Sequence, residues 1–191
     1  VFDFMNIITK YIFTITLLIA GVLNLNAQKP VLKFNQDGKF KIVQFTDTHI
    51  IHGDSRSDVA MERMNEVLDA EKPDLVIYTG DLIFGQPGKE SLMQALEPVV
   101  TRAIPFAVTW GNHDDEQGVD KDKLLKMYQK HGGKYCLAYD AVPSMSGTAV
   151  HNLPVYSSKD ARNFASDFST PGRTFSNLET KSTCFLVAMP S

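Results

Sequence analysis

The stretch FKIVQFTDTH, residues 40–49, joins an almost continuous apolar and β-branched run to two polar residues, Asp47 and His49. A run of this kind is typical of a strand that is buried on both faces of a sheet. Two similar stretches follow along the chain, DLVIYTGD at 74–81 and IPFAVTWGNHD at 104–114. The sequence therefore predicts three buried strands, each of which ends in residues that can carry chemistry.

Helical periodicity separates these strands. Apolar residues recur on one face of residues 57–71, and residues 89–102 and 120–131 show the same spacing. Pro98 is expected to kink or divide the second of these helices. Strands that alternate with helices indicate βαβ units, and hence an α/β fold with a largely parallel sheet that is covered on both faces.

Polar residues at the ends of three strands predict a metal site. Asp47 and His49 follow the first strand, Asp81 the second, and Asn112 and His113 the third. Ligands in parallel α/β sheets gather beyond the carboxyl ends of the strands, so these residues should meet. A single such Asp is more often a turn former, but all three motifs in this order indicate chemistry. Carboxylate, amide and imidazole ligands favour manganese, iron or zinc, and two ions about 3.5–4 Å apart can clamp a phosphoryl group.

The segments FTDTH at 45–49, YTGDL at 78–82 and WGNHD at 110–114 resemble the motifs of the calcineurin-like metallophosphoesterases. The likeness is greatest to the exported bacterial branch related to purple acid phosphatases, and it runs from about residue 40 to about residue 160. It implies a four-layer α/β/β/α sandwich. It also implies a metal-dependent phosphoric ester hydrolase, which acts on phosphate esters through a dinuclear centre.

The resemblance further implies a role for each metal ligand. Asp47 and His49 would hold the first ion, Asp81 would bridge the two ions, and Asn112 would hold the second. The ions would be manganese, iron or zinc. Gly80 would let the backbone turn sharply beside them.

Two residues of the third motif are assigned to catalysis by the same resemblance. His113 would face the substrate, where it either stabilises the phosphoryl group or protonates the leaving oxygen. Asp114 would accept a hydrogen bond from His113 and orient its ring. Asp115 and Glu116 extend the acidic run, and they fit a solvated loop as well as a place beside the site.

The second half of the family pattern does not follow. A later lone His and a Gly-His-x-His motif should complete both metal shells, yet the later histidines are only His131 and His151. Residues 31–160 resemble the N-terminal half of the domain, with a strand expected at 150–159. Residues 161–191 show no sustained period, and only 184–189 suit a strand. We expect this tail to come from a frame shift or a mispredicted end, a real linker being the alternative, and the domain to be truncated and poorly active.

The N-terminal residues 1–27 are expected to be a signal peptide, with residues 1–4 as an upstream extension. Met5 begins a short basic segment, residues 11–25 form an apolar run, and the small residue Ala27 suits a cleavage site. The protein would then be exported, periplasmic or secreted, with no membrane span after cleavage. The alternative is an uncleaved anchor, for which the run is shorter than the roughly 20 residues required.

Composition limits the other partners. A formal net charge of −3 gives no electrostatic reason to bind nucleic acid, so the expected partner is a phosphate-ester substrate. Cys136 and Cys184 are too few for a disulfide framework, and their pairing is open. The oligomeric state, the choice between monoester and diester, and the metal are open as well.

Two other functions fit part of the pattern. A non-catalytic remnant or binding protein with a half-built metal site agrees with the absent histidines, whereas the intact first three motifs argue against long decay. A flavodoxin-like binding domain would need a phosphate-binding glycine loop after the first strand, where this chain has Asp-Thr-His at 47–49.

The signal peptide leads to a direct prediction. Cleavage after Ala27 should give an exported chain that begins near Gln28, as measured by N-terminal sequencing of protein recovered outside the cytoplasm. An intact Met5 on a cytoplasmic product would contradict the assignment.

Overall fold

The computed structural model describes residues 10–12, 28–141, 144, 147–149 and 151–157, together with the backbone of 183–188. The predicted signal peptide, apart from residues 10–12, lies outside the described residues, as does the tail apart from 183–188. None of the helices in the described ranges combines the length and the apolar content needed to cross a bilayer.

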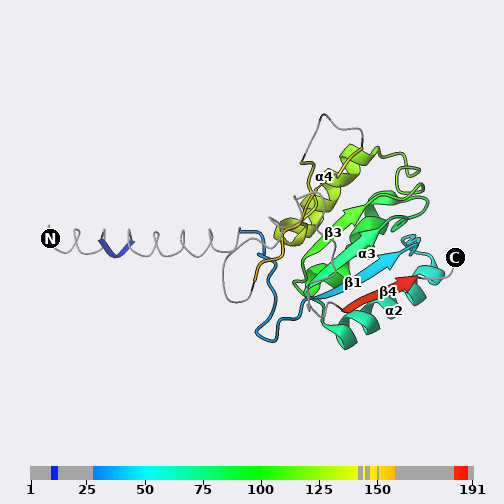
Figure 1. Cartoon of the computed structure of the whole chain (residues 1–191). Helices are drawn as coiled ribbons and strands as arrows, with labels where there is room; N and C mark the ends of the chain where they lie inside the picture. The colour runs from blue at the N-terminus through cyan, green and yellow to red at the C-terminus, as the bar shows by residue number, and fades with distance from the viewer. Residues whose placement is uncertain are drawn as a thin grey trace.

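Four parallel strands form one sheet in the order β3-β2-β1-β4 (Figure 1). The strands are β1 (Lys41–Thr46), β2 (Leu75–Thr79), β3 (Phe106–Thr109) and β4 (Thr183–Ala188). The first three confirm the predicted buried strands. β4 confirms the strand expected within the tail, and it pairs with β1 at the edge of the sheet.

Three helices connect or follow the strands: α2 (Ser55–Glu71), α3 (Gly88–Thr101) and α4 (Lys121–Gly132), the last of which continues into the 3-10 turn η1 (Gly133–Tyr135). α2 begins two residues before its predicted start, because the carboxylate of Asp54 caps it by accepting the N–H of Arg56 at 2.9 Å. α3 is not divided at Pro98. The proline ring is buried there, and the missing N–H removes only one helical hydrogen bond.

All three helices pack against the same face of the sheet. Val43, Phe45 and Tyr78 of the strands belong to one core cluster with Met64 of α2 and Leu96 of α3. Strands β1, β2 and β3 follow one another across the sheet, so right-handed crossovers put α2 and α3 on the same side. Leu124 and Tyr128 of α4 belong to the same core cluster.

The opposite face of the sheet carries no helix among the described residues, but it is covered, as predicted, by other parts of the chain. Ile42 and Ile77 instead meet a smaller cluster from irregular segments, which comprises Leu32, Phe34, Phe40, Leu137, Leu153 and Val155. The described part of the chain thus provides one helical layer and one sheet of an α/β fold. The strand expected at 150–159 is wrong within residues 151–157, where a single bridge joins Tyr156 to Lys33.

The helix-covered core contains one polar group whose replacement gives a clear prediction. The hydroxyl of Tyr78 is buried and has no hydrogen-bond partner among the described residues. Tyr78→Phe removes this unsatisfied group, so it should raise the free energy of unfolding by about 1 kcal/mol in urea denaturation. Tyr139→Phe is the matched control, because the Tyr139 hydroxyl donates to the Asn152 carbonyl at 3.2 Å and its loss should not stabilise the protein. Destabilisation by Tyr78→Phe would contradict this expectation.

Candidate metal centre

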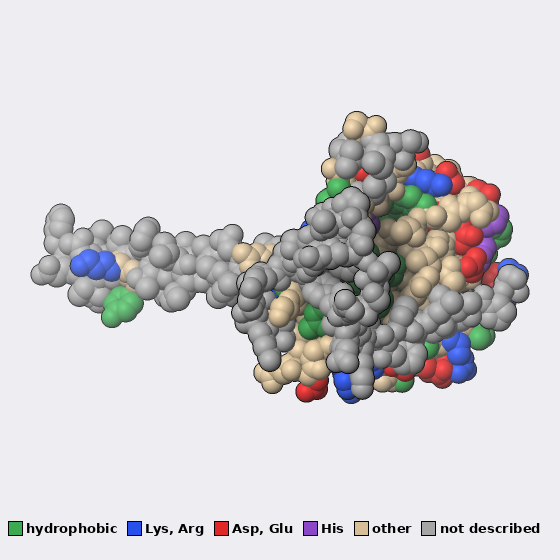
Figure 2. All heavy atoms as spheres, in the orientation of Figure 1, with side chains coloured by type: hydrophobic (Ala, Val, Ile, Leu, Met, Phe, Trp, Pro, Cys, Tyr) green, Lys and Arg blue, Asp and Glu red, His purple; other side chains and the backbone are tan. Residues whose placement is uncertain are grey.

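The loops that follow β1, β2 and β3 meet at the edge toward which the strands point (Figure 1). Figure 2, which has the same orientation as Figure 1, shows acidic and histidine side chains gathered at this edge. The loops after β1 and β2 are paired through their backbones beyond the ends of the strands. Asp47 N–H donates to the Gly80 carbonyl at 3.1 Å, and His49 N–H donates to the Asp81 carbonyl at 3.0 Å. These two hydrogen bonds fix the position of the loop after β1 relative to the loop after β2.

Asp47, His49 and Asp81 converge at the centre of this edge. Each offers one ligand atom, and the three atoms lie within 4.8 Å of one another. All three residues have left-handed backbone conformations, with φ of 55°, 46° and 52°. They are half of the six non-glycine residues with positive φ in the described part of the chain. Such conformations cost roughly 1–3 kcal/mol each, and their concentration here marks a functional site.

Two glycines allow the loops to approach each other so closely. Gly80 has φ of 106°, and a Cβ atom there would lie 2.6 Å from the backbone nitrogen of Gly111. A Cβ atom on Gly111 would collide with the carboxylate of Asp81. Both positions therefore require glycine if Asp81 is to keep its place.

The side chain of Asp114 links the loops after β2 and β3 by hydrogen bonds. Its buried carboxylate accepts N–H groups from Gly111 at 2.7 Å, Asp81 at 2.9 Å and Leu82 at 3.1 Å. Burial raises the pKa of Asp114, while these three donors act in the opposite direction. The predicted hydrogen bond between Asp114 and the ring of His113 is therefore wrong: both carboxylate oxygens turn inward to backbone N–H groups.

His113 lies beside Asp81 and takes a different partner. Its backbone N–H donates to Asp81 Oδ1 at 2.8 Å, and its ring Nδ1 lies 2.7 Å from Glu116 Oε2. The hydrogen bond with Glu116 raises the pKa of His113, and burial opposes the change. Glu116 thus takes the position that was predicted for Asp114. Its spacing of three residues from His113, one helical turn, was the available signal.

Phe84, which no sequence motif singled out, completes the centre. Its ring centroid lies 5.2 Å from that of His49 and 5.2 Å from that of His113, and the two histidine rings are 5.6 Å apart. The only sequence signal for Phe84 is its position shortly after the Gly80-Asp81 motif. Asn112 is exposed in the same loop as His113, and its role as a ligand stays a prediction.

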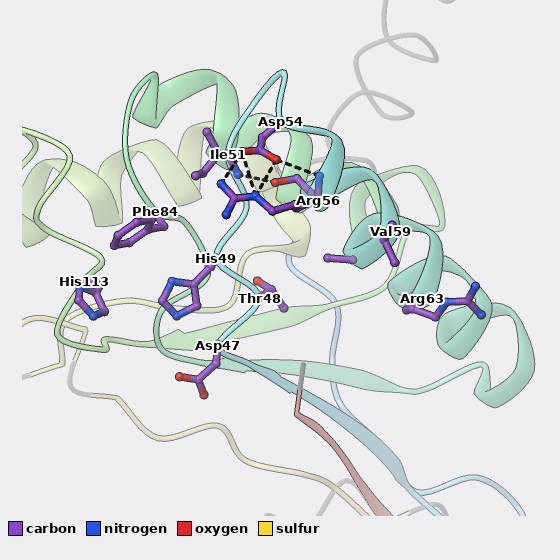
Figure 3. Close-up of a pocket in the computed structure, with 12 residues that line it drawn as sticks. Asp47, Thr48, His49, Ile51, Asp54, Arg56, Val59, Arg63, Phe84 and His113 are labelled. Atoms are coloured by element: carbon purple, nitrogen blue, oxygen red, sulfur yellow. Dashed lines mark hydrogen bonds and ion pairs between the residues drawn. The ribbon is translucent and has the colours of Figure 1, made fainter. Parts of the chain in front are cut away.

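A cavity of about 640 Å³ opens beside these residues (Figure 3). Asp47, His49 and His113 line one end, and side chains from α2 line the other. Figure 3 shows His49, His113 and Phe84 grouped together, whereas Val59 and Arg63 lie on α2, away from this group.

The residues present fit a divalent metal. Asp81 is only 8% exposed, and it shares a small volume with the carboxylate of Asp47. Two carboxylates so close repel each other, and a buried charge needs a partner. A cation satisfies both requirements. Two carboxylates and an imidazole are ligands that manganese, iron and zinc accept.

Comparison with known proteins agrees with this chemistry. The model of the family described as calcineurin-like phosphoesterase matches residues 40–180. Phosphatase DCR2 of Saccharomyces cerevisiae is 39% identical over 113 residues, which are 50% of this chain and 20% of the yeast protein. Probable inactive purple acid phosphatase 28 of Arabidopsis thaliana is 33% identical over 147 residues, 64% of this chain and 37% of the plant protein.

A bacterial protein is also similar. The uncharacterized metallophosphoesterase YkuE of Bacillus subtilis is 29% identical over 115 residues, 59% of this chain and 34% of its own length. The chain spans roughly a fifth to two fifths of the length of these relatives.

The position of Asp114 leads to a prediction. Asp114→Asn puts an amide NH₂ against backbone donors, so it should lower the free energy of unfolding by about 2 kcal/mol. It should also weaken metal binding, because Asp81 loses its anchor. Asp115→Asn is the matched control, since Asp115 is exposed and lies 3.8 Å from Lys121; it should change stability by less than about 0.5 kcal/mol. Denaturation curves and metal titration measure both effects. Equal behaviour of the two variants would contradict the anchoring role of Asp114.

Proposed function

Because this chain belongs to the calcineurin-like phosphoesterase family, we propose that it binds divalent metal ions and hydrolyses phosphate esters at a dinuclear site. The observation that carries the proposal is the convergence of Asp47, His49 and Asp81 within 4.8 Å. This set comes from two separate loops, each held in a strained conformation.

The residues divide the work of such a reaction. Asp47, His49 and Asp81 would hold one ion, and Asp81 and Asn112 a second. Bound divalent ions would supply an activated nucleophile and neutralise charge on the phosphoryl group. The backbone N–H of His113 donates a hydrogen bond to the Asp81 carboxylate, and its ring Nδ1 is hydrogen-bonded to Glu116. Its Nε2 is then the nitrogen that can donate a proton to the leaving oxygen.

A binding role without turnover is the second candidate. It is favoured by the similar plant protein, whose name describes it as probably inactive. It is also favoured by the ligands that this chain supplies to a second ion, Asp81 and Asn112. A carboxylate and a neutral amide hold a hydrated cation weakly.

We further propose that the protein is exported, on the strength of the signal-like residues 1–27, and that phosphate esters rather than nucleic acids are its partners.

Two substitutions separate metal binding from catalysis. Asp81→Asn removes the buried charge, so it should lower manganese affinity by at least about tenfold. His113→Ala should keep the metal and reduce kcat by roughly 10²–10⁴, the range for a positioned acid. Asp58→Asn, an exposed carboxylate on α2, is the control and should change neither.

Metal content by elemental analysis and phosphate-ester kinetics decide between the candidates. Metal bound without measurable turnover in the parent chain would support the binding role. Loss of metal in His113→Ala together with its retention in Asp81→Asn would overturn the separate roles of His113 and Asp81.

A further inference from the structure

We propose that the cavity beside the metal centre receives an apolar group of the substrate. The preferred ligands would be phosphoryl compounds that carry an uncharged aromatic or aliphatic group, rather than sugar phosphates or polyphosphates. This inference rests on the proposed function, since it assumes that the phosphoryl group lies against Asp47, His49 and His113.

The wall of the cavity is apolar where it leaves the metal centre. Ile51, Val59, Ala60 and Phe84 line it. Val59 is 58% exposed and Phe84 is 38% exposed, and they are two of seven large hydrophobic side chains exposed in the described part of the chain. Exposed apolar residues that gather in one cavity, beside a polar centre, indicate a ligand site more strongly than scattered ones do.

The charges of the wall are already neutralised. Arg56 is bound to Asp54, with its Nη2 2.7 Å from Oδ2 and its Nε 3.1 Å from Oδ1, and the guanidinium lowers the pKa of Asp54 to about 2. Figure 3 shows this pair above the centre. Arg63 is paired with Glu62 and Glu66. Both arginines that line the cavity thus have carboxylate partners, so the wall offers a second phosphate less net positive charge than two unpaired arginines would.

Phe84 connects the apolar wall to the reacting end. Its ring packs against the rings of both His49 and His113, so a group attached to the phosphoryl oxygen would contact Phe84 first. Aromatic rings at such separations attract one another beyond simple burial. Val59 on α2 then extends the apolar surface away from the metal centre (Figure 3).

Two non-hydrolysable phosphonates test the inference without requiring turnover. Methylphosphonate and benzylphosphonate share the metal-binding group and differ in the apolar group. Isothermal titration calorimetry of the full chain with manganese should show benzylphosphonate binding at least about tenfold more tightly. Omitting manganese should abolish binding of both.

Variants locate the preference. Phe84→Ser should reduce the preference for benzylphosphonate by about tenfold, and Val59→Ser by about threefold. Val59 lies on α2, away from the metal ligands, so Val59→Ser should leave methylphosphonate affinity and metal content nearly unchanged. Met93→Ser is the matched control, because Met93 is 46% exposed on α3 but does not line this cavity, and its preference should equal that of the parent chain.

The outcomes separate the two proposals. Equal metal-dependent affinity for both phosphonates would overturn the apolar-group inference and leave the proposed function standing. An equal loss of preference in Met93→Ser and Phe84→Ser would also overturn it. Absence of manganese binding and of binding by either phosphonate would overturn both.

Discussion

The metal centre depends on one interaction, in which the buried carboxylate of Asp114 accepts three backbone N–H groups. A carboxylate without partners would cost several kcal/mol when buried, so these donors are a condition for its presence. Because two of them belong to the loop after β2 and one to the loop after β3, the same bonds fix those loops relative to each other. Asp81 is held through its own N–H, and its side chain is thereby aimed at Asp47 and His49.

This anchoring explains how the site tolerates its strain. Asp47, His49 and Asp81 all have positive φ, which unsupported loops would relax. The backbone pairing from Asp47 to Gly80 and from His49 to Asp81 prevents that relaxation on one side, and Asp114 prevents it on the other. A bound cation would add stability by relieving the repulsion between the two carboxylates, so metal binding and loop order should be coupled.

The parts that could be predicted from sequence are those set by burial and by chain direction. β1, β2 and β3 were visible as apolar runs because a strand buried on both faces carries few polar residues. Their polar ends had to converge because parallel strands share one carboxyl edge. The partner of Asp114 was not predictable, because sequence does not say whether a carboxylate turns toward a neighbouring ring or toward backbone donors. The single helix-covered face followed from strand order, which local patterns do not encode.

The same topology separates chemistry from selectivity. All three helices lie on one face, so the short connection after β1 leads directly into the first turns of α2 beside the metal centre. The loop after β1 therefore supplies Asp47 and His49, while Val59 on the helix that follows supplies part of the cavity wall. Val59 is exposed and lies outside the core, so its replacement removes little packing. The apolar wall can consequently change with small cost in stability, whereas Asp81 and Asp114 are fixed by the bonds that hold the loops together.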